Sequence, residues 1–269
     1  MISGLGFFEV IIILLIVLMF FGSKELPRFI REAARMIGKL RLYSEKVRRE
    51  LNEVTSFTSD IASPEKSFRD EVNEKKNRLR AICLKRRKSL TEEEHTQKSA
   101  LIAEYLFETD EFKKAKTVLM YAAAKTEVRT EECIKSMLSK GRRVVLPYCY
   151  PNSSEMGIAE IKDFSTDIRV GEYKMLEPVD EIRNNFLKSD IQLVVCPGVG
   201  FDKNGARLGR GKGCYDAFLK ELKEKAPIVG FAYQCQMLSE DLPFDYHDIP
   251  MDMIITEEGV KRYGQDTTI

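Results

Sequence analysis

The sequence predicts an α/β domain preceded by an N-terminal transmembrane helix and an amphipathic helix. Three observations predict this arrangement. The first is an apolar stretch at residues 2–22, and the second is a set of short β-branched runs that alternate with helix-length charged segments after residue 70. The third is four glycines interleaved with cations at residues 205–216. The chain has 269 residues, of which 43% are apolar and 32% charged. This balance is that of a globular protein and excludes disorder along the whole chain.

The first segment is long enough to cross a bilayer, because about 20 apolar residues span its hydrocarbon core. Glu9 is the only ionisable side chain between residues 2 and 22, and the first basic residue is Lys24, so the basic leader of a cleaved signal peptide is missing. Residues 24–50 carry nine basic and four acidic side chains. The positive-inside rule therefore places the N-terminus outside and the rest of the chain in the cytoplasm.

Residues 26–51 have apolar side chains at helical spacing, with arginines around the rest of the helix. We expect this amphipathic helix to lie on membrane lipid, with its arginines near the lipid phosphates. A solvated helix that packs against the following domain remains an alternative. Glu9 is costly in lipid and is expected to contact a polar group of another membrane subunit.

The pattern of GF.E, an apolar span, FGSKELP and a basic helix resembles the small membrane subunits of the twin-arginine protein translocase, nearer the B type than the A type. Ser23 stands where the family usually has proline. The resemblance implies self-association of the membrane helix, a polytopic translocase subunit as partner, and a single-pass protein of the bacterial inner membrane. We assign residues 1–54 to this membrane part.

Residues 55–69 are rich in serine and threonine and predict a flexible linker. Residues 70–269 then predict a largely parallel sheet flanked by helices on both faces. The expected helices cover residues 70–89, 91–108, a run ending at 139, and about 215–225. The expected strands lie at residues 117–123, 142–148, 190–198, 227–233 and 251–256, with a loop-rich stretch between the second and the third.

Composition limits the chemistry of the domain. The six cysteines are far apart and form no CxxC pair, and His95 and His247 are the only histidines, so neither a zinc site nor a disulfide framework is expected. A net charge of +1 does not indicate a nucleic-acid partner, and none is expected. Carboxylates, cationic side chains and backbone amides are left to perform the chemistry.

The glycine segment, GARLGRGKGCYD at residues 205–216, lies between an expected strand and an expected helix, where open α/β sheets bind ligands. Its glycines allow backbone N–H groups to approach phosphate oxygens, and Arg207, Arg210 and Lys212 would neutralise the phosphate charge. The segment is neither a Walker A loop nor a GxGxxG motif. Asp216 could hold Mg²⁺ or complement the helix dipole. The alternative is a surface loop with solvated charges.

PGVGFDKNGARLGRGKGCYDAFL, at residues 197–219, resembles the signature of the 5-formyltetrahydrofolate cyclo-ligase family, and the resemblance extends over about residues 74–256. Weaker matches are KKNRLR at 75–80, residues 126–147, Glu177 with Pro178, and HDIPMDMIIT at 247–256. The resemblance implies cyclisation of 5-formyltetrahydrofolate to 5,10-methenyltetrahydrofolate with ATP and Mg²⁺. The formyl oxygen would be phosphorylated first; N10 would then attack the activated carbon, and phosphate would leave.

The resemblance also implies residue roles. Arg210 and Lys212 would be catalytic, and Asp216 and Asp248 would hold Mg²⁺. The folate would contact Ala122, Glu127, Met156 and Cys214. ATP would contact Lys76, Arg80, Arg207, Leu208, Gly209, Arg210, Gly211, Lys212, Gly213, Cys214 and Tyr215.

Each role has a plain alternative. Lys76 and Arg80 could belong to a solvated helix face, Glu127 could complement the N-terminus of a helix, Met156 could be packing, and Asp248 could cap the next segment.

Two positions depart from the family pattern. Cys214 replaces the first of two tyrosines, and Ala122 is smaller than the apolar residue common there. The phosphate-handling positions remain, which favours an active, membrane-tethered enzyme. A translocase subunit with an inert or regulatory C-terminal domain is the alternative, and a chance fusion of two parts that work separately is a third interpretation.

Overall fold

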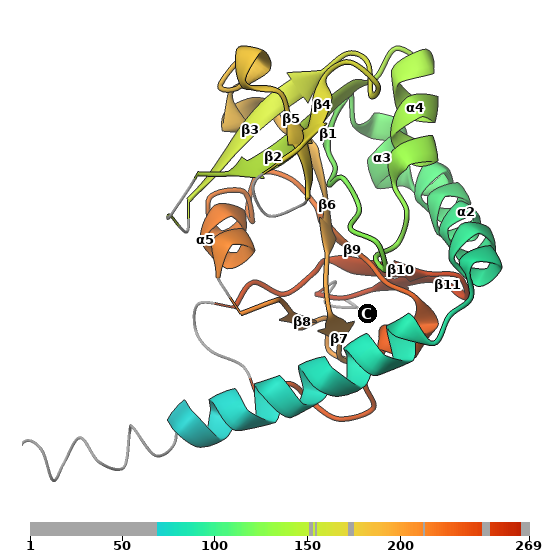
Figure 1. Cartoon of the computed structure of the whole chain (residues 1–269), viewed down its shortest axis with the longest axis vertical. Helices are drawn as coiled ribbons and strands as arrows, with labels where there is room; N and C mark the ends of the chain where they lie inside the picture. The colour runs from blue at the N-terminus through green and yellow to red at the C-terminus, as the bar shows by residue number, and fades with distance from the viewer. Residues whose placement is uncertain are drawn as a thin grey trace, which may run out of the picture. The chain divides into compact units, whose positions relative to one another are not determined.

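The computed structural model describes residues 69–264 except positions 151, 152, 154, 172–174, 212 and 244–247. The predicted membrane helix, amphipathic helix and linker lie outside these residues and stay predictions. Within the described part of the chain, no helix combines the length and hydrophobicity needed to cross a membrane. Contacts group Glu71–Ile269 into one compact unit, drawn in Figure 1.

A mostly parallel sheet forms the centre of this unit (Figure 1). Its seven strands follow the order β11-β10-β9-β6-β1-β2-β3, and only the two edge strands, β3 and β11, are antiparallel to their neighbours. The strands are β1 (Thr117–Leu119), β2 (Arg143–Cys149), β3 (Met156–Ile161), β6 (Leu193–Pro197), β9 (Ile228–Phe231), β10 (Met253–Thr256) and β11 (Gly259–Arg262). The central strands are almost fully buried, as expected for a sheet that is covered on both faces.

Helices begin at caps that the sequence supplies. Thr91 and Glu94 form a capping box at the start of α2 (Glu92–Glu108), and Thr109 caps α3 (Asp110–Lys114). The other helices are a first helix over residues 69–88, α4 (Glu131–Ser139), α5 (Cys214–Lys220) and the short 3₁₀ turns η1 (Asp180–Ile182), η2 (Lys188–Asp190) and η3 (Gln234–Gln236).

Alternation along the strands divides the core into two layers. Val118 of β1 faces α2 and α4, where it packs with Ile102 and Ile134. Leu119, the next residue, faces α5 and packs in the same cluster as Phe218. Because successive strand residues point to opposite faces, each strand supplies both layers. Figure 1 shows α2 and α4 on one side of the sheet and α5 on the other.

The predicted α/β class is confirmed, and within residues 70–256 so is a helix or strand at each expected place. The stretch expected to be loop-rich differs, because it contains β3 and the hairpin of β4 (Ile168–Val170) and β5 (Leu176–Pro178). β3 pairs with β2 from Val144 to Cys149 and buries most of its residues at the sheet edge. Its glycine and its place at the edge of the sheet hid this strand in the sequence. A smaller hairpin, β7 (Gly200–Phe201) and β8 (Arg207–Leu208), follows β6.

Gly157 of β3 lies opposite Tyr148 of β2, and a Cβ atom at this position would overlap the tyrosine ring. We expect Gly157→Ala to lower the free energy of unfolding by about 1–3 kcal/mol, the usual cost of overpacking. Urea denaturation measures the loss. In a Tyr148→Ala background the same substitution should cost less, and an equal loss in both backgrounds would show that the ring is not the cause.

Candidate active site

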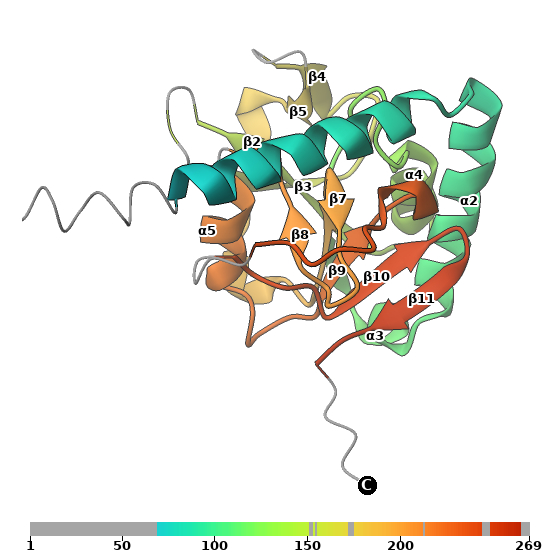
Figure 2. The same cartoon turned by 90° about the horizontal axis from the view of Figure 1, so that it is seen from below.

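Several of the expected site residues lie at or after the carboxyl ends of neighbouring parallel strands. Glu127 comes after β1, the glycine segment comes after β6, and Met156 pairs with Cys149 at the end of β2. Because these strands are parallel, their carboxyl ends meet at one edge of the sheet, which is where α/β folds bind ligands. The first helix crosses this region beside β7 and β8 (Figure 2).

The glycine segment, residues 205–216, makes a turn with open space on its outer side, and we call it the glycine turn. Gly211 and Gly213 have φ angles of 100° and 68°, a conformation that glycine adopts without strain. A Cβ atom on Gly213 would meet nothing within 4 Å, and one on Gly211 would lie 3.7 Å from the guanidinium of Arg80. The turn therefore offers its backbone to a ligand. Lys212, which lies between the two glycines, is outside the described residues.

Arg80 of the first helix reaches this turn, and Lys76, one helical turn before it, pairs with Asp248. Arg80 donates from Nε to the carbonyl of Gly209 at 2.8 Å, and Lys76 Nζ lies 2.8 Å from Asp248 Oδ2. Burial lowers the pKa of Arg80, and the nearby Asp248 acts in the opposite direction. The helix is held in place because Leu79 packs in the same buried cluster as Leu208. Two distant segments of the predicted site are thereby brought together.

Arg207 and Asp216 form an ion pair within the glycine segment, with 2.5 Å between the guanidinium and the carboxylate. The Arg207 side chain is only 3% exposed, and it also lies 5.4 Å from the ring centroid of Tyr215. Burial acts to lower the pKa of Arg207, but its neighbours Cys196 and Asp216 outweigh burial, and the pKa rises. Its Nε is buried and has no hydrogen-bond partner among the described residues.

Arg210 reaches across to Glu127, at 2.6 Å from guanidinium nitrogen to carboxylate oxygen. Arg210 is 50% exposed, whereas Glu127 is 6% exposed and its second carboxylate oxygen accepts from the backbone N–H of Ala124 at 2.9 Å. The carboxylate is therefore fixed by the fold, while the arginine belongs to the open glycine turn. The ion pair joins the turn to the loop after β1.

The remaining expected residues are more deeply embedded. Ala122 and Met156 are buried, 8% and 6% exposed, and they belong to the cores on opposite faces of the sheet. Leu208 is in the core, so only its main chain could face a ligand. Cys214 is the half-buried first residue of α5, and Cys149 packs against the same buried cluster.

Arg87, Tyr233 and Gln236 are buried polar residues beneath this region that the sequence reasoning did not identify. Arg87 donates to Thr126 Oγ1 and to the carbonyl of Gly198, and burial lowers its pKa. A signal was available for Arg87, because Leu79, Cys83 and Arg87 follow each other at intervals of four on one helix face. The signal was masked by the many charges around it.

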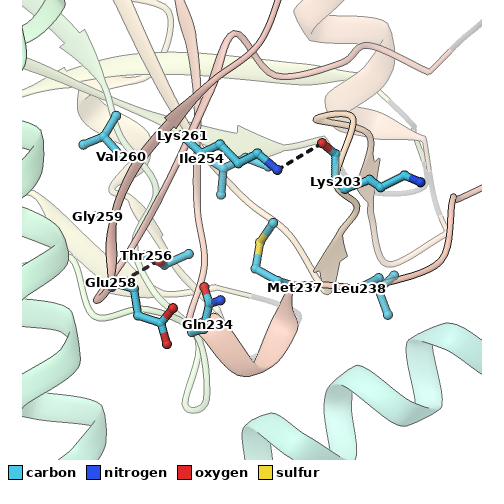
Figure 3. A pocket seen from close by; sticks show the side chains of 10 residues that line it. All are labelled: Lys203, Gln234, Met237, Leu238, Ile254, Thr256, Glu258, Gly259, Val260 and Lys261. Atoms are coloured by element: carbon cyan, nitrogen blue, oxygen red, sulfur yellow. Dashed lines mark hydrogen bonds between the residues drawn. The ribbon is translucent and has the colours of Figure 1, made fainter.

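A hollow of about 350 Å³ lies elsewhere, between η3, β10 and β11 (Figure 3). Thr256, Glu258 and Val260 are among its lining residues, with Lys261 donating to the carbonyl of Lys203. None of the expected site residues lines it. It is therefore separate from the glycine turn.

Comparisons with known proteins agree with the resemblances. Residues 72–257 match the model of the 5-formyltetrahydrofolate cyclo-ligase family, and residues 3–50 match the model of the mttA/Hcf106 family. A 5-formyltetrahydrofolate cyclo-ligase of Mus musculus is 28% identical over 70% of this chain and 96% of its own length.

Two solved structures are similar to this one. The 5,10-methenyltetrahydrofolate synthetase of Aquifex aeolicus is 34% identical with a TM-score of 0.62, and the match covers 72% of this chain and 95% of that one. The synthetase of Mycoplasma pneumoniae is 26% identical with a TM-score of 0.54, over 68% of this chain and 98% of that one. The family model alone matches more than half of the sequence. The chain thus belongs to the 5-formyltetrahydrofolate cyclo-ligase family and carries an enzyme of that family in residues 72–257.

Proposed function

We propose that this chain cyclises 5-formyltetrahydrofolate to 5,10-methenyltetrahydrofolate with ATP and Mg²⁺, releasing ADP and phosphate, on a domain tethered to a membrane. One observation carries the nucleotide part of the proposal. Arg207 and Arg210 belong to the open glycine turn, Arg80 donates to its backbone, and Lys76 lies one helical turn from Arg80. Three of these four cations are paired with a carboxylate. A triphosphate could replace those carboxylates as the partner of the cations.

The residues fit a triphosphate. Gly211 and Gly213 leave open space where side chains would otherwise stand, and the buried Nε of Arg207 has no partner among the described residues. Arginine forks suit phosphate oxygens, whereas lysine acts as a compact charge. We assign the ATP phosphates to the turn from Arg207 to Tyr215 and to Lys76 and Arg80, with Lys212 expected to take part.

The residues also fit a magnesium ion that arrives with the nucleotide. In the described part of the chain, no three His, Cys, Asp or Glu side chains gather as a ready metal site. Magnesium needs only one or two protein carboxylates when phosphate oxygens and water complete its shell. Asp216 and Asp248 flank the cations and would supply them. The ion would neutralise part of the charge that develops during phosphoryl transfer.

The folate is expected beside Glu127, Ala122, Met156 and Cys214, all at the same edge of the sheet. Its formyl oxygen would attack the γ-phosphorus, and the bond from phosphorus to ADP would break. N10 would then attack the formyl carbon, the carbon–oxygen bond to phosphate would break, and N10 would lose its proton. We expect Arg210, which lies on the glycine turn and pairs with Glu127, to stabilise the transferring phosphoryl group.

A spectroscopic assay tests this proposal. We expect the whole chain in detergent, and residues 70–269 alone, to convert 5-formyltetrahydrofolate into the ultraviolet-absorbing methenyl product with one ADP formed per product. Omission of ATP or Mg²⁺ should stop the reaction. A folded, folate-binding protein without turnover at saturating substrates would instead favour the inert or regulatory domain.

The match of residues 3–50 to the mttA/Hcf106 family supports the membrane part of the proposal. We infer a single-pass helix in a bacterial inner membrane, with the N-terminus outside and the enzyme in the cytoplasm, in contact with lipid and with a polytopic translocase subunit. Residues 1–54 should restore export in cells that lack their B-type subunit. Normal insertion without export would mean that residues 1–54 act only as a membrane anchor. The result of the enzyme assay does not depend on this outcome.

A further inference from the structure

A buried polar network supports the loop that carries Glu127. The hydroxyl of Tyr233, a residue that is 0% exposed just after β9, lies at its centre. This hydroxyl donates to the carbonyl of Glu127 at 3.1 Å. It also lies 2.9 Å from Ser99 Oγ and 2.9 Å from His95 Nδ1, both on α2. Three elements that are distant in sequence therefore meet at one oxygen atom.

The hydrogens of this network can be assigned so that each group is satisfied. Ser99 Oγ accepts from the backbone N–H of Arg129 at 2.9 Å, which leaves its own hydrogen for the oxygen of Tyr233. Tyr233 then donates to Glu127, and His95 Nδ1 donates to the second lone pair of the tyrosine. Burial lowers the pKa of His95, which keeps the ring neutral, with one nitrogen protonated.

Hydrogen bonds of this network hold the main chain on both sides of Val128. Tyr233 binds the carbonyl of Glu127, Ser99 binds the N–H of Arg129, and between them the carbonyl of Val128 accepts from Tyr121 Oη at 3.0 Å. Such groups are costly to leave unpaired in the interior, so the loop has little freedom to move. The Glu127 carboxylate is consequently held in one direction by its own loop, although its partner Arg210 is half-exposed.

We propose that Tyr233, together with Ser99, is a positioning residue for the folate substrate. It presents the Glu127 carboxylate at a fixed place for the N–H donors of a pterin-like ring, without touching the substrate itself. This inference rests on the proposed function. It predicts that the network affects folate binding more than ATP binding, because Arg210 is the one proposed phosphate-binding cation paired with Glu127 among the described residues and the others are attached to other groups.

The test is Tyr233→Phe in the whole chain. Removing the hydroxyl should raise KM for 5-formyltetrahydrofolate about tenfold, the effect of leaving a buried acceptor unpaired, while KM for ATP changes less than about twofold. Tyr263→Phe is the matched control, since it removes another buried tyrosine hydroxyl, one with no partner among the described residues. It should leave both KM values unchanged.

Ser99→Ala supplies a second variant, and it carries the test if Tyr233→Phe fails to fold. It should raise the same KM, and the double variant should be less than additive, because both side chains hold one loop. An unchanged folate KM, an equal rise in both KM values, or a fall in kcat alone would overturn the inference. Inactivity of the unmodified chain would instead refute the proposed function, so the two failures are distinguishable.

Discussion

Replacement of Arg210 by alanine is expected to lower kcat/KM by about 100- to 1,000-fold, the cost of removing one group that stabilises developing charge. Arg210 lies on the open glycine turn, and its only described partner is the carboxylate of Glu127. Its side chain is half-exposed, but Glu127 is only 6% exposed, so the thermal midpoint should also fall because a buried carboxylate loses its partner. Steady-state kinetics and thermal denaturation of the same preparation measure both effects.

Arg262→Ala is the matched control for this variant. Arg262 forms a similar pair with Glu111, at 2.9 Å, and is 40% exposed, but it lies on the edge strand β11. The control should keep full activity. A loss of activity in both variants, or full activity in Arg210→Ala, would contradict a catalytic role for Arg210.

The second large effect is expected from Arg207→Met. The substitution leaves the Asp216 carboxylate without its partner, and breaking a buried ion pair costs about 3–5 kcal/mol. We expect a loss of about 3 kcal/mol, the lower end of that range, because the Asp216 side chain keeps 21% exposure. Such a loss lowers the thermal midpoint by about 6–12 °C for a domain of this size. Activity should fall as well, because Arg207 is one of the cations proposed to bind the ATP phosphates.

Arg207→Met combined with Asp216→Leu separates the two effects. Removing both charges leaves no unpaired carboxylate, so most of the stability should return, while activity should stay low. Recovery of activity along with stability would mean that this pair only supports the fold. If the double variant does not regain stability, the loss in free energy of unfolding comes from altered packing around Tyr215 and not from the unpaired Asp216 carboxylate.

Much of the fold could be predicted because apolar runs and helical spacing are local signals. The buried run LVVCP and the capping residues Thr91 and Glu94 indicate a strand and a helix start without any tertiary information. β3 could not be predicted with the same certainty. It is an edge strand whose place depends on pairing with β2, and pairing is a tertiary property.

Only part of the candidate site could likewise be predicted from the sequence. The glycine-rich segment could be recognised from composition, and the contact of Arg80 with it agrees with the site that the family resemblance implies. The partners of the cations from the first helix were not predictable, because each joins segments that are distant in sequence, such as Lys76 with Asp248. Tyr233 was also missed, because one tyrosine after an apolar strand gives no sign that its hydroxyl will hold the loop of Glu127.

The central claim is that ATP binds at the turn from Arg207 to Asp216 and at the first helix. Hydrogen exchange of the whole chain, measured with and without ATP and Mg²⁺, tests this claim directly. We predict slower exchange at the amides of residues 205–216 and 74–82 when the nucleotide is bound, with little change elsewhere. Binding of ATP with no protection of these segments, or with protection confined to the hollow between β10 and β11, would contradict it.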